Sequence, residues 1–299
     1  MGRGRRRTWE VTSGPVPRIS VPGSMPLERG SPCSAHGCVM NERVQRWSDR
    51  WDRTLEVVRA PRVRIEVSGD ETARADFRVF TARHPRLKVV AAKRWGVALL
   101  AIPDSFEEYL NGGSRHRRRK RNRAEKAGFR YAVVPPLEHL DEILEVNRSA
   151  PSRQGRPMSD RYVDRELVLR EHEHDAEMHA ILDPAGHVRA YAITHDLGDV
   201  VAFSKLMGHA DDLDAGVMYL LVSEIVRRCV VSRQETRLPT WLMYDTYWGA
   251  KAGLATFKTR LGFTPYTVRW VWAGPEPSAE PVTGVDAHGS VRSGDGRGP

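Results

Sequence analysis

Residues 240–272 read TWLMYDTYWGAKAGLATFKTRLGFTPYTVRWVW, and this stretch decides the fold. The apolar run 241–243 is typical of a buried strand, and glycines at 249 and 253 then mark a loop. The apolar residues that come next recur at the spacing of a helix: Leu254, Phe257 and Leu261. Gly262 then stands at the position of a helix C-cap. An alternating set of residues closes the stretch and predicts a strand with one buried face: Tyr266, Val268, Trp270 and Trp272. Lys258 follows Phe257 and should emerge beside the buried face of the helix.

This pattern resembles the end of a GNAT-fold acyltransferase domain. The residues that carry the resemblance are Tyr244, Asp245, Gly253, Leu254, Phe257, Lys258, Gly262 and Phe263. More narrowly, the pattern is similar to the Fem-type branch, which transfers amino acids from aminoacyl-tRNA, and to its sister group, the FemAB-like acetyltransferases. The resemblance covers residues 77–272. It implies an α/β (α+β) fold of the GNAT type, with a mixed, mostly antiparallel sheet whose splayed central strands are flanked by helices.

Composition and charge limit the class of protein. The 299 residues are 40% hydrophobic, which is enough for a sizeable core, and eight are Trp. The net charge of +9 and the pI of about 9.7 favour polyanionic partners such as nucleic acid. Three cysteines do not make a disulfide framework, and Cys33, His36 and Cys38 lack the second ligand pair that a structural zinc site needs. We therefore expect no metal.

Domain boundaries follow from shifts in composition. Residues 1–40 are rich in Gly, Pro, Ser and Arg and predict a disordered extension, and residues 274–299 predict a disordered tail. We expect residues 41–273 to form one domain, GNAT-like as the resemblance implies, that begins with an amphipathic helix over 41–55. No apolar run is long enough to span a bilayer, and no apolar segment follows the arginines at 5–7 as an export signal would require. We expect a soluble, cytoplasmic protein.

The elements between these boundaries follow from periodicity and turn residues. Four strand-like runs predict an antiparallel opening: 62–67, 77–82, 88–93 and 97–102. Further expected strands are 129–134, the hairpin 178–182 with 187–195, and 200–207. Expected helices are 137–147, a helix capped by Asp160 that runs to about 172, and a core helix on which Met218 and Cys229 share a buried face.

A strongly basic segment follows Ser114, which is a good N-cap. It carries eight positive charges: Arg115, Arg117, Arg118, Arg119, Lys120, Arg121, Arg123 and Lys126. Only Glu125 opposes them, and Gly128 closes the segment, so we expect a helix with positive charge on every face. Such a helix is either simply solvated or binds the phosphates of a tRNA or another donor. The sequence leaves these alternatives open.

Candidate catalytic residues come mainly from the resemblance. It implies that Lys258 stabilises the carbonyl oxygen as it gains negative charge. Asp245, Tyr244 and Tyr247 are candidates for orienting the acceptor amine or taking its proton. Phe257 and Lys205 join the basic segment as candidate donor-binding residues. Candidate acceptor-binding residues lie in a polar loop and on the central strand: Arg153, Gln154, Arg156 and Ser204.

The stretch 205–216 departs from the ordinary GNAT pattern. In ordinary GNAT enzymes, a glycine-rich loop before a helix holds the pyrophosphate of coenzyme A with backbone N–H groups. Here the stretch carries Asp211, Asp212 and Asp214, which would repel a pyrophosphate. The resemblance to the Fem-type branch, which lacks this loop, is therefore favoured.

The sequence predicts an N-acyltransferase that moves an aminoacyl group from aminoacyl-tRNA to an amine acceptor. Its partners would be tRNA and a small-molecule or peptide amine, with no cofactor and no membrane span. Two alternatives stay open: an acyl-CoA-dependent N-acetyltransferase of the same fold, and a nucleic-acid-binding protein without catalysis.

Overall fold

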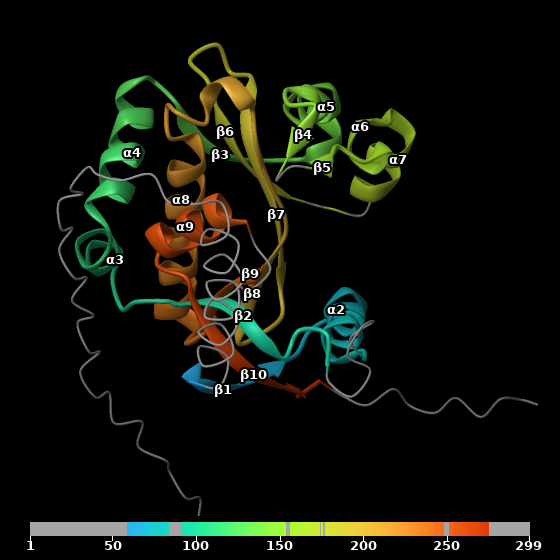
Figure 1. Cartoon of the computed structure of the whole chain (residues 1–299), viewed down its shortest axis with the longest axis vertical. Helices are drawn as coiled ribbons and strands as arrows, with labels where there is room; N and C mark the ends of the chain where they lie inside the picture. Colours follow the sequence, from blue (N-terminus) through green and yellow to red (C-terminus); the bar gives the residue numbers. More distant parts are fainter. Residues whose placement is uncertain are drawn as a thin grey trace, which may run out of the picture. The chain divides into compact units, whose positions relative to one another are not determined.

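An eight-stranded mixed sheet organises the part of the chain that the computed structural model describes (Figure 1). The structure describes residues 59–83, 91–153, 156–173, 175, 177–247 and 251–274. The strands lie in the order β1 (Arg62–Val67), β10 (Thr264–Trp272), β2 (Trp95–Ala101), β9 (Trp241–Thr246), β8 (Val200–Gly208), β7 (Val188–Asp196), β6 (Met178–Leu182) and β3 (Arg130–Val134). Neighbouring strands run antiparallel, except that β1 is parallel to β10 and β8 is parallel to β9. A separate hairpin pairs β4 (Ser152–Arg153) with β5 (Arg156–Pro157).

Helices cover both faces of this sheet (Figure 1). The helices are α2 (Glu71–Thr81), α3 (Phe106–Gly112), α4 (Arg115–Lys126), α5 (Leu140–Arg148), α6 (Asp160–Val163), α7 (Arg165–His172), α8 (Val217–Thr236) and α9 (Ala252–Leu261), with short 3₁₀ turns at Pro136–His139 and Ala210–Asp212. Successive residues of β2 alternate between the faces: Ala98 and Leu100 pack with α8, whereas Val97 and Leu99 pack with α2. Helix α5 packs on the α2 side of β6 and β7.

The predicted fold class is confirmed. The sheet is mixed and mostly antiparallel, and its central strands splay: β8 and β9 pair only from Val200 with Trp241 to Ala202 with Met243. The core helix α8 buries Cys229, whose thiol pKa is raised by burial to about 12. The stretch 240–272 folds as predicted into β9, α9 and β10, with Gly262 in the left-handed conformation at the end of α9.

The predicted antiparallel opening is wrong. Residues 77–82 belong to helix α2 and the residue after it, because the Asp70 side chain caps this helix at the Ala73 N–H and the apolar residues recur at helical spacing. Phe80 on that helix packs against Trp270, at 4.9 Å between ring centroids. Strand β1 pairs with β10 rather than with its sequence neighbours. Of the expected strand 88–93, residues 92 and 93 form a turn, and Ala91 makes only an isolated bridge to Arg83.

The helix expected from Asp160 to residue 172 is divided. Helix α6 ends at Val163, and Asp164 then caps α7 by accepting from the Leu167 N–H. Several other predictions lie outside the described residues: the extension 1–40, the helix 41–55, residues 88–90, Gln154, and the tail beyond residue 274. In the part of the chain that is described, no helix has the length and apolar composition that a bilayer crossing demands.

A buried arginine joins the helices on the α8 face. Arg117 on α4 is 1% exposed and donates through Nη1 to the Leu261 carbonyl at the end of α9, at 2.8 Å. Its Nη2 donates to the Tyr109 carbonyl on α3, and its guanidinium lies 3.6 Å from the centre of the Tyr109 ring. The Tyr109 hydroxyl donates to the same Leu261 carbonyl at 3.1 Å. The C-terminus of α9 is therefore fixed by α3 and α4.

We expect Arg117→Ala to lower the free energy of unfolding by roughly 3–5 kcal/mol, because it removes the Arg117 donor from the Tyr109 carbonyl and one of two donors from the Leu261 carbonyl, and it opens a cavity. Arg119 lies on the exposed side of the same helix, so Arg119→Ala should change stability by about 0.5 kcal/mol or less. Urea unfolding of both variants measures the difference. Equal small effects would show that the Arg117 contacts do not stabilise the fold.

Candidate active site

The candidate site is built around Lys258, a buried ammonium on α9. Its side chain is 1% exposed, because α9 packs its apolar side on the sheet and Lys258 lies within that packed side. The Nζ atom donates to the Tyr244 and Thr246 carbonyls on β9, at 2.7 Å each. It also lies 4.4 Å from the centre of the Tyr244 ring. Hydrogen bonds and a cation–π contact thus hold the charge at the C-terminal end of β9.

Lys258 occupies the place where the two central strands separate. The β8–β9 ladder ends at Ala202 and Met243, so Tyr244 and Thr246 belong to the length of β9 that has no pairing with β8. On β8, the register with β7 shifts between Ile193 and Thr194, and Ser204 is the extra, exposed residue. A bulge of this kind bends a strand and re-aims its side chains, and bulges are common next to active sites.

The ammonium has one N–H donor more than the two carbonyls accept. A lysine ammonium carries three N–H donors, and the two carbonyls of β9 use two of them. Burial, and to a smaller degree the positive charge of Lys93, lowers the pKa of Lys258 to about 8. The charged form therefore still predominates near neutral pH. A desolvated cation with a free donor can stabilise negative charge on a carbonyl oxygen far better than a hydrated one.

Aromatic rings surround the candidate oxyanion site. The Tyr244 ring packs edge-on against Phe203, Phe257 and Phe263, with centroids 5.6–6.5 Å apart. Burial raises the pKa of Tyr244 to about 12, so its phenol stays protonated and is a poor base. Phe257 also packs edge-on against Tyr219 of α8, at 5.1 Å. These rings give the ammonium its low-dielectric surroundings.

Asp245 and Tyr247 lie at the rim of this site. Asp245 has a positive φ of 49°, and its half-exposed carboxylate forms an ion pair with Lys93. A residue other than glycine in this conformation is uncommon and often marks a functional site. The Tyr247 hydroxyl is hydrogen-bonded to Thr259 on α9, and its N–H donates to the Gly96 carbonyl. The structure thus brings Lys258, Tyr244, Asp245 and Tyr247 together, while their roles in catalysis stay predictions.

Lys205 lies in a different polar cluster, on the α5–α7 side of β8. Its Nζ forms an ion pair with Glu171 at 2.7 Å and is hydrogen-bonded to His172 Nε2 at 3.1 Å. His172 is fully buried, and its Nδ1 is 2.7 Å from a carboxylate oxygen of Asp175. Burial lowers the pKa of Lys205, although Glu171 opposes that shift. These partners already occupy the amine, so we leave Lys205 out of the proposed donor interface.

The predicted acceptor-binding residues are not gathered at Lys258. Arg153 Nη2 donates to the Val146 carbonyl at 2.8 Å and to the Gly208 carbonyl at 3.0 Å, which fixes the loop to α5 and β8. Gln154 and the side chain of Arg156 lie outside the described residues. Ser204, at the bulge, is exposed and is the member of this set that lies on a central strand.

Helix α4 has a buried side as well as an exposed side, contrary to the expectation of positive charge on every face. Arg117 is fixed as described above, and Arg121 is paired with Glu125 at 2.6 Å and with Glu224 of α8 at 3.0 Å. Lys120 donates to the Asp214 carbonyl at 2.6 Å. The exposed side still presents a continuous basic stripe, which consists of Arg115, Arg118, Arg119, Arg123 and Lys126.

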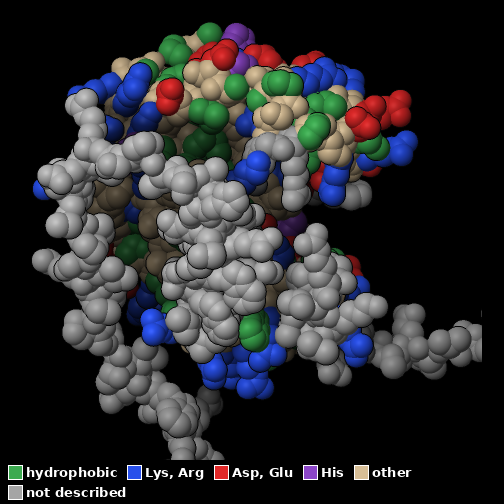
Figure 2. Space-filling view, viewed as in Figure 1, with side chains coloured by type: hydrophobic (Ala, Val, Ile, Leu, Met, Phe, Trp, Pro, Cys, Tyr) green, Lys and Arg blue, Asp and Glu red, His purple; other side chains and the backbone are tan. Residues whose placement is uncertain are grey.

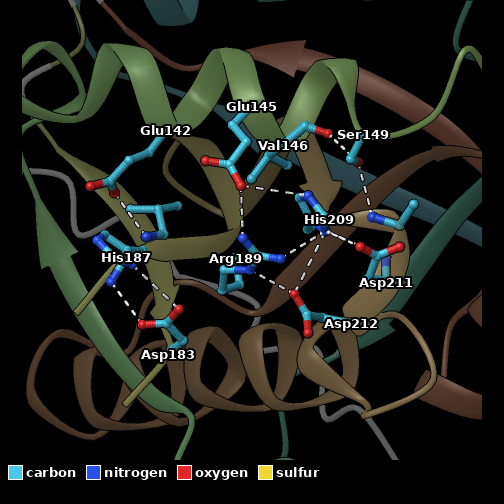
Figure 3. A network of polar contacts seen from close by, with 12 residues as sticks. Glu142, Glu145, Val146, Ser149, Asp183, His187, Arg189, His209, Asp211 and Asp212 are labelled. Carbon is cyan, nitrogen blue, oxygen red and sulfur yellow. Dashed lines mark hydrogen bonds and ion pairs between the residues drawn. The ribbon is translucent and has the colours of Figure 1, made fainter. Parts of the chain in front are cut away.

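The N-terminus of α8 is closed to a phosphate. Gly216 precedes this helix with a φ of 101°, and a Cβ built there would lie 2.3 Å from the Lys120 carbonyl oxygen of α4. The preceding turn is fixed by a polar network (Figure 3) in which Arg189 donates to Asp212 at 2.7 Å and to Glu145 at 2.8 Å. His209 Nδ1 lies 2.9 Å from Arg189 Nη2 within the same network. This geometry differs from an open, glycine-rich anion-binding loop.

Sequence reasoning missed several contributors to the site. Lys93 was assigned to a strand, whereas it lies in the turn that reaches Asp245. Trp270 fixes this turn, because its Nε1 donates to the Lys93 carbonyl at 2.5 Å. The His172–Asp175 pair gave no recognisable spacing signal. The Asp70 cap of α2 could have been found, since Asp followed by an amphipathic pattern is a helix start signal.

Comparisons with known proteins give fold-level likenesses. No protein-family model and no curated protein matches the chain. Among solved structures, FemX is similar at a TM-score of 0.46 and 13% identity, over 57% of this chain and 59% of that chain. The C-terminal domain of a putative lysylphosphatidylglycerol synthetase from Agrobacterium fabrum is similar at 0.41 and 14%, over 56% and 57%. A tandem GNAT protein from the clavulanic acid biosynthesis pathway is similar at 0.37 and 10%, over 57% and 50%. The chain thus matches less than two thirds of the length of each.

The low pKa of Lys258 predicts a specific pH dependence of stability. Between the folded value of about 8 and the ordinary value of 10.5, the unfolded chain binds a proton that the folded chain does not. The free energy of unfolding therefore rises with pH in this window relative to a variant without the amine. Lys258→Met keeps a long side chain without the charge, and thermal unfolding of both proteins at several pH values measures the difference. We expect the free energy of unfolding of the wild-type protein to rise relative to that of Lys258→Met as the pH increases above 8. A difference that stays constant with pH would contradict the lowered pKa.

Proposed function

We propose that the protein is an N-acyltransferase that forms an amide by transferring an aminoacyl group from aminoacyl-tRNA to an amine acceptor. The observation that carries this proposal is the Lys258 ammonium. It is 1% exposed, it is held by two carbonyls of β9, and it lies where β8 and β9 separate. A surface lysine would need none of these features.

The chemistry follows from the free donor of Lys258. The neutral acceptor amine attacks the carbonyl carbon of the aminoacyl ester, and the carbonyl π electrons move to the oxygen. Lys258 stabilises this oxyanion by a charge-assisted hydrogen bond. As the oxyanion collapses, the ester C–O bond breaks and the tRNA ribose oxygen leaves, taking up one proton in place of the one that the attacking nitrogen releases. The attacking nitrogen loses a proton, for which the half-exposed Asp245 carboxylate at the rim is the candidate acceptor.

Two features favour a donor carried on tRNA over coenzyme A. The exposed stripe of α4 follows the same side of the molecule as α9, because the Ser114 hydroxyl donates to the Arg260 carbonyl at 3.3 Å. Its arginines have the charge and spacing to contact successive phosphates. The N-terminus of α8, by contrast, is covered by the Lys120 carbonyl and preceded by Asp211, Asp212 and Asp214. This arrangement disfavours a pyrophosphate.

Transfer of radiolabelled amino acid from charged tRNA tests the proposal. Purified full-length protein is incubated with tRNA charged with each amino acid and with a panel of small-molecule and peptide amines. We expect one amino acid to appear in an alkali-stable amide product. Lys258→Met should lower the rate roughly 10²–10³-fold, the usual effect of removing an oxyanion donor. Lys251→Met alters an exposed lysine next to the same helix and should leave the rate unchanged.

Two outcomes would reject the proposal. Label transfer from acetyl-CoA, with none from any charged tRNA, would establish the coenzyme A alternative. Tight tRNA binding without transfer from either donor, unaffected by Lys258→Met, would indicate a nucleic-acid-binding protein without catalysis.

A further inference from the structure

A second basic surface lies where β1, β10 and the start of β2 meet. It surrounds a cavity of about 740 Å³ that is lined by Arg62, Arg64, Arg94, Arg269 and Trp95, among others. Figure 2 shows Lys and Arg side chains gathered at the bottom of the view, where Figure 1 labels β1 and β10. We propose that this surface binds a single-stranded segment of nucleic acid, with a base stacked on Trp95 and phosphates on the arginines. None of these residues belongs to the α4 stripe.

Trp95 has the properties of a stacking platform. It is the first residue of β2, and its backbone is fixed by pairing with Thr267 of β10. Its side chain is nevertheless 47% exposed, although a large indole normally packs into the core of a domain of this size. Stacking on an exposed aromatic ring accepts any base, because every base has a π face.

The arginines around Trp95 are available for phosphates. Among the residues that the structure describes, Arg64 alone of the four forms an ion pair, with Glu66 at 2.8 Å. Arg62, Arg94 and Arg269 have no side-chain hydrogen bond or ion pair there. Parallel pairing of β1 with β10 places Arg64 directly opposite Arg269 in the strand register, so both side chains leave the sheet on the same face. Neighbouring positive charges repel one another, and an anionic nucleic-acid backbone offsets that repulsion.

A single strand fits this surface better than a duplex does. A duplex hides its bases by stacking and pairing, so Trp95 would have nothing to stack on. Arginines alone would bind a duplex through phosphates without using the indole. The combination of an exposed indole with unpaired arginines in one cavity is the arrangement typical of single-strand binding.

The surface adjoins the candidate active site. Val97, two residues after Trp95 and so roughly 7 Å along the strand, pairs with Thr246, whose carbonyl accepts from Lys258. Lys93, next to Arg94, is the ion-pair partner of Asp245. A single-stranded segment on Trp95 would therefore end close to the splayed strands. This part of the inference rests on the proposed function and assigns the surface to the single-stranded 3′ end of the charged tRNA.

Binding of a fluorescently labelled, uncharged RNA 12-mer ending in CCA tests the inference by fluorescence anisotropy. Trp95→Ala should weaken binding roughly fivefold or more, since it removes one base–aromatic stack, and Trp95→Phe should restore most of the loss. Arg94→Ala should weaken binding and lower the salt slope by about 0.7 for the lost phosphate contact. Arg170→Ala removes an exposed arginine of α7 and serves as the charge-matched control, with little change expected. A duplex of the same sequence should bind more weakly and show no effect of Trp95→Ala.

The outcomes separate this inference from the proposed function. If binding of the 12-mer depends on Trp95 but no charged tRNA yields an amide, the proposed single-strand-binding surface is supported and the proposed acyltransferase function is rejected. If the protein forms the amide but Trp95→Ala changes neither 12-mer binding nor KM for charged tRNA, the proposed binding surface is rejected and the proposed acyltransferase function is supported. Equal binding of single strand and duplex, or equal effects of Arg94→Ala and Arg170→Ala, would also overturn the inference.

Discussion

The structure depends on one physical constraint: a buried ammonium must have acceptors. Lys258 is 1% exposed, so its charge has lost almost all contact with water. The strand divergence supplies the compensation, because β9 continues beyond its pairing with β8 and offers the Tyr244 and Thr246 carbonyls to the amine. The acceptors of the buried charge thus come from the length of β9 that has no pairing with β8. The proposed function places the substrate carbonyl at this same divergence of the two strands.

The other helices on the α8 face of the sheet fix the position of α9 relative to β9. Arg117 and the Tyr109 hydroxyl both donate to the Leu261 carbonyl, so α3 and α4 fix the end of the helix that carries Lys258. Gly262 ends that helix, and the ring of Phe263 packs against the ring of Tyr244. The arginines of α4 thus fall into a buried, structural group and an exposed group. Arg117 and Arg121 are structural, and the exposed arginines are free to meet a polyanion.

Sequence patterns predicted the parts of the fold in which local signals agree with tertiary packing. The stretch 240–272 combines a buried strand, a capped helix and an alternating strand, and all three form. The strand predicted over residues 77–82 was wrong because the run FRVFTA carries β-branched and aromatic residues, whereas the helix is decided by the Asp70 cap and by packing on Trp270 and Trp272. The position of Lys258 beside the buried face of its helix was readable from its place next to Phe257. The two carbonyls that hold it were not, because they depend on how far β9 runs past β8.

Charged residues were the hardest to assign from sequence. Arg117 and Arg118 look alike in the chain, yet one is buried between three helices and the other is exposed. What distinguishes these two arginines is the side of α4 on which each one lies. One side of α4 packs against α3, α8 and α9, and the other side faces solvent. The grouping of Arg94 and Trp95 with Arg62 and Arg269 could not be predicted from the sequence, because it depends on the parallel pairing of β1 with β10.

The most direct measurement is a crystal structure of the protein with a short RNA ending in CCA, whose 3′ terminus carries an amino acid through a nonreactive amide in place of the ester. We predict that the carbonyl oxygen of this amino acid lies between β8 and β9, roughly 3 Å from Lys258 Nζ, while Tyr244 and Thr246 keep their hydrogen bonds to the same amine. A bound aminoacyl group whose carbonyl lies elsewhere, with Lys258 contacting nothing but its own chain, would contradict it.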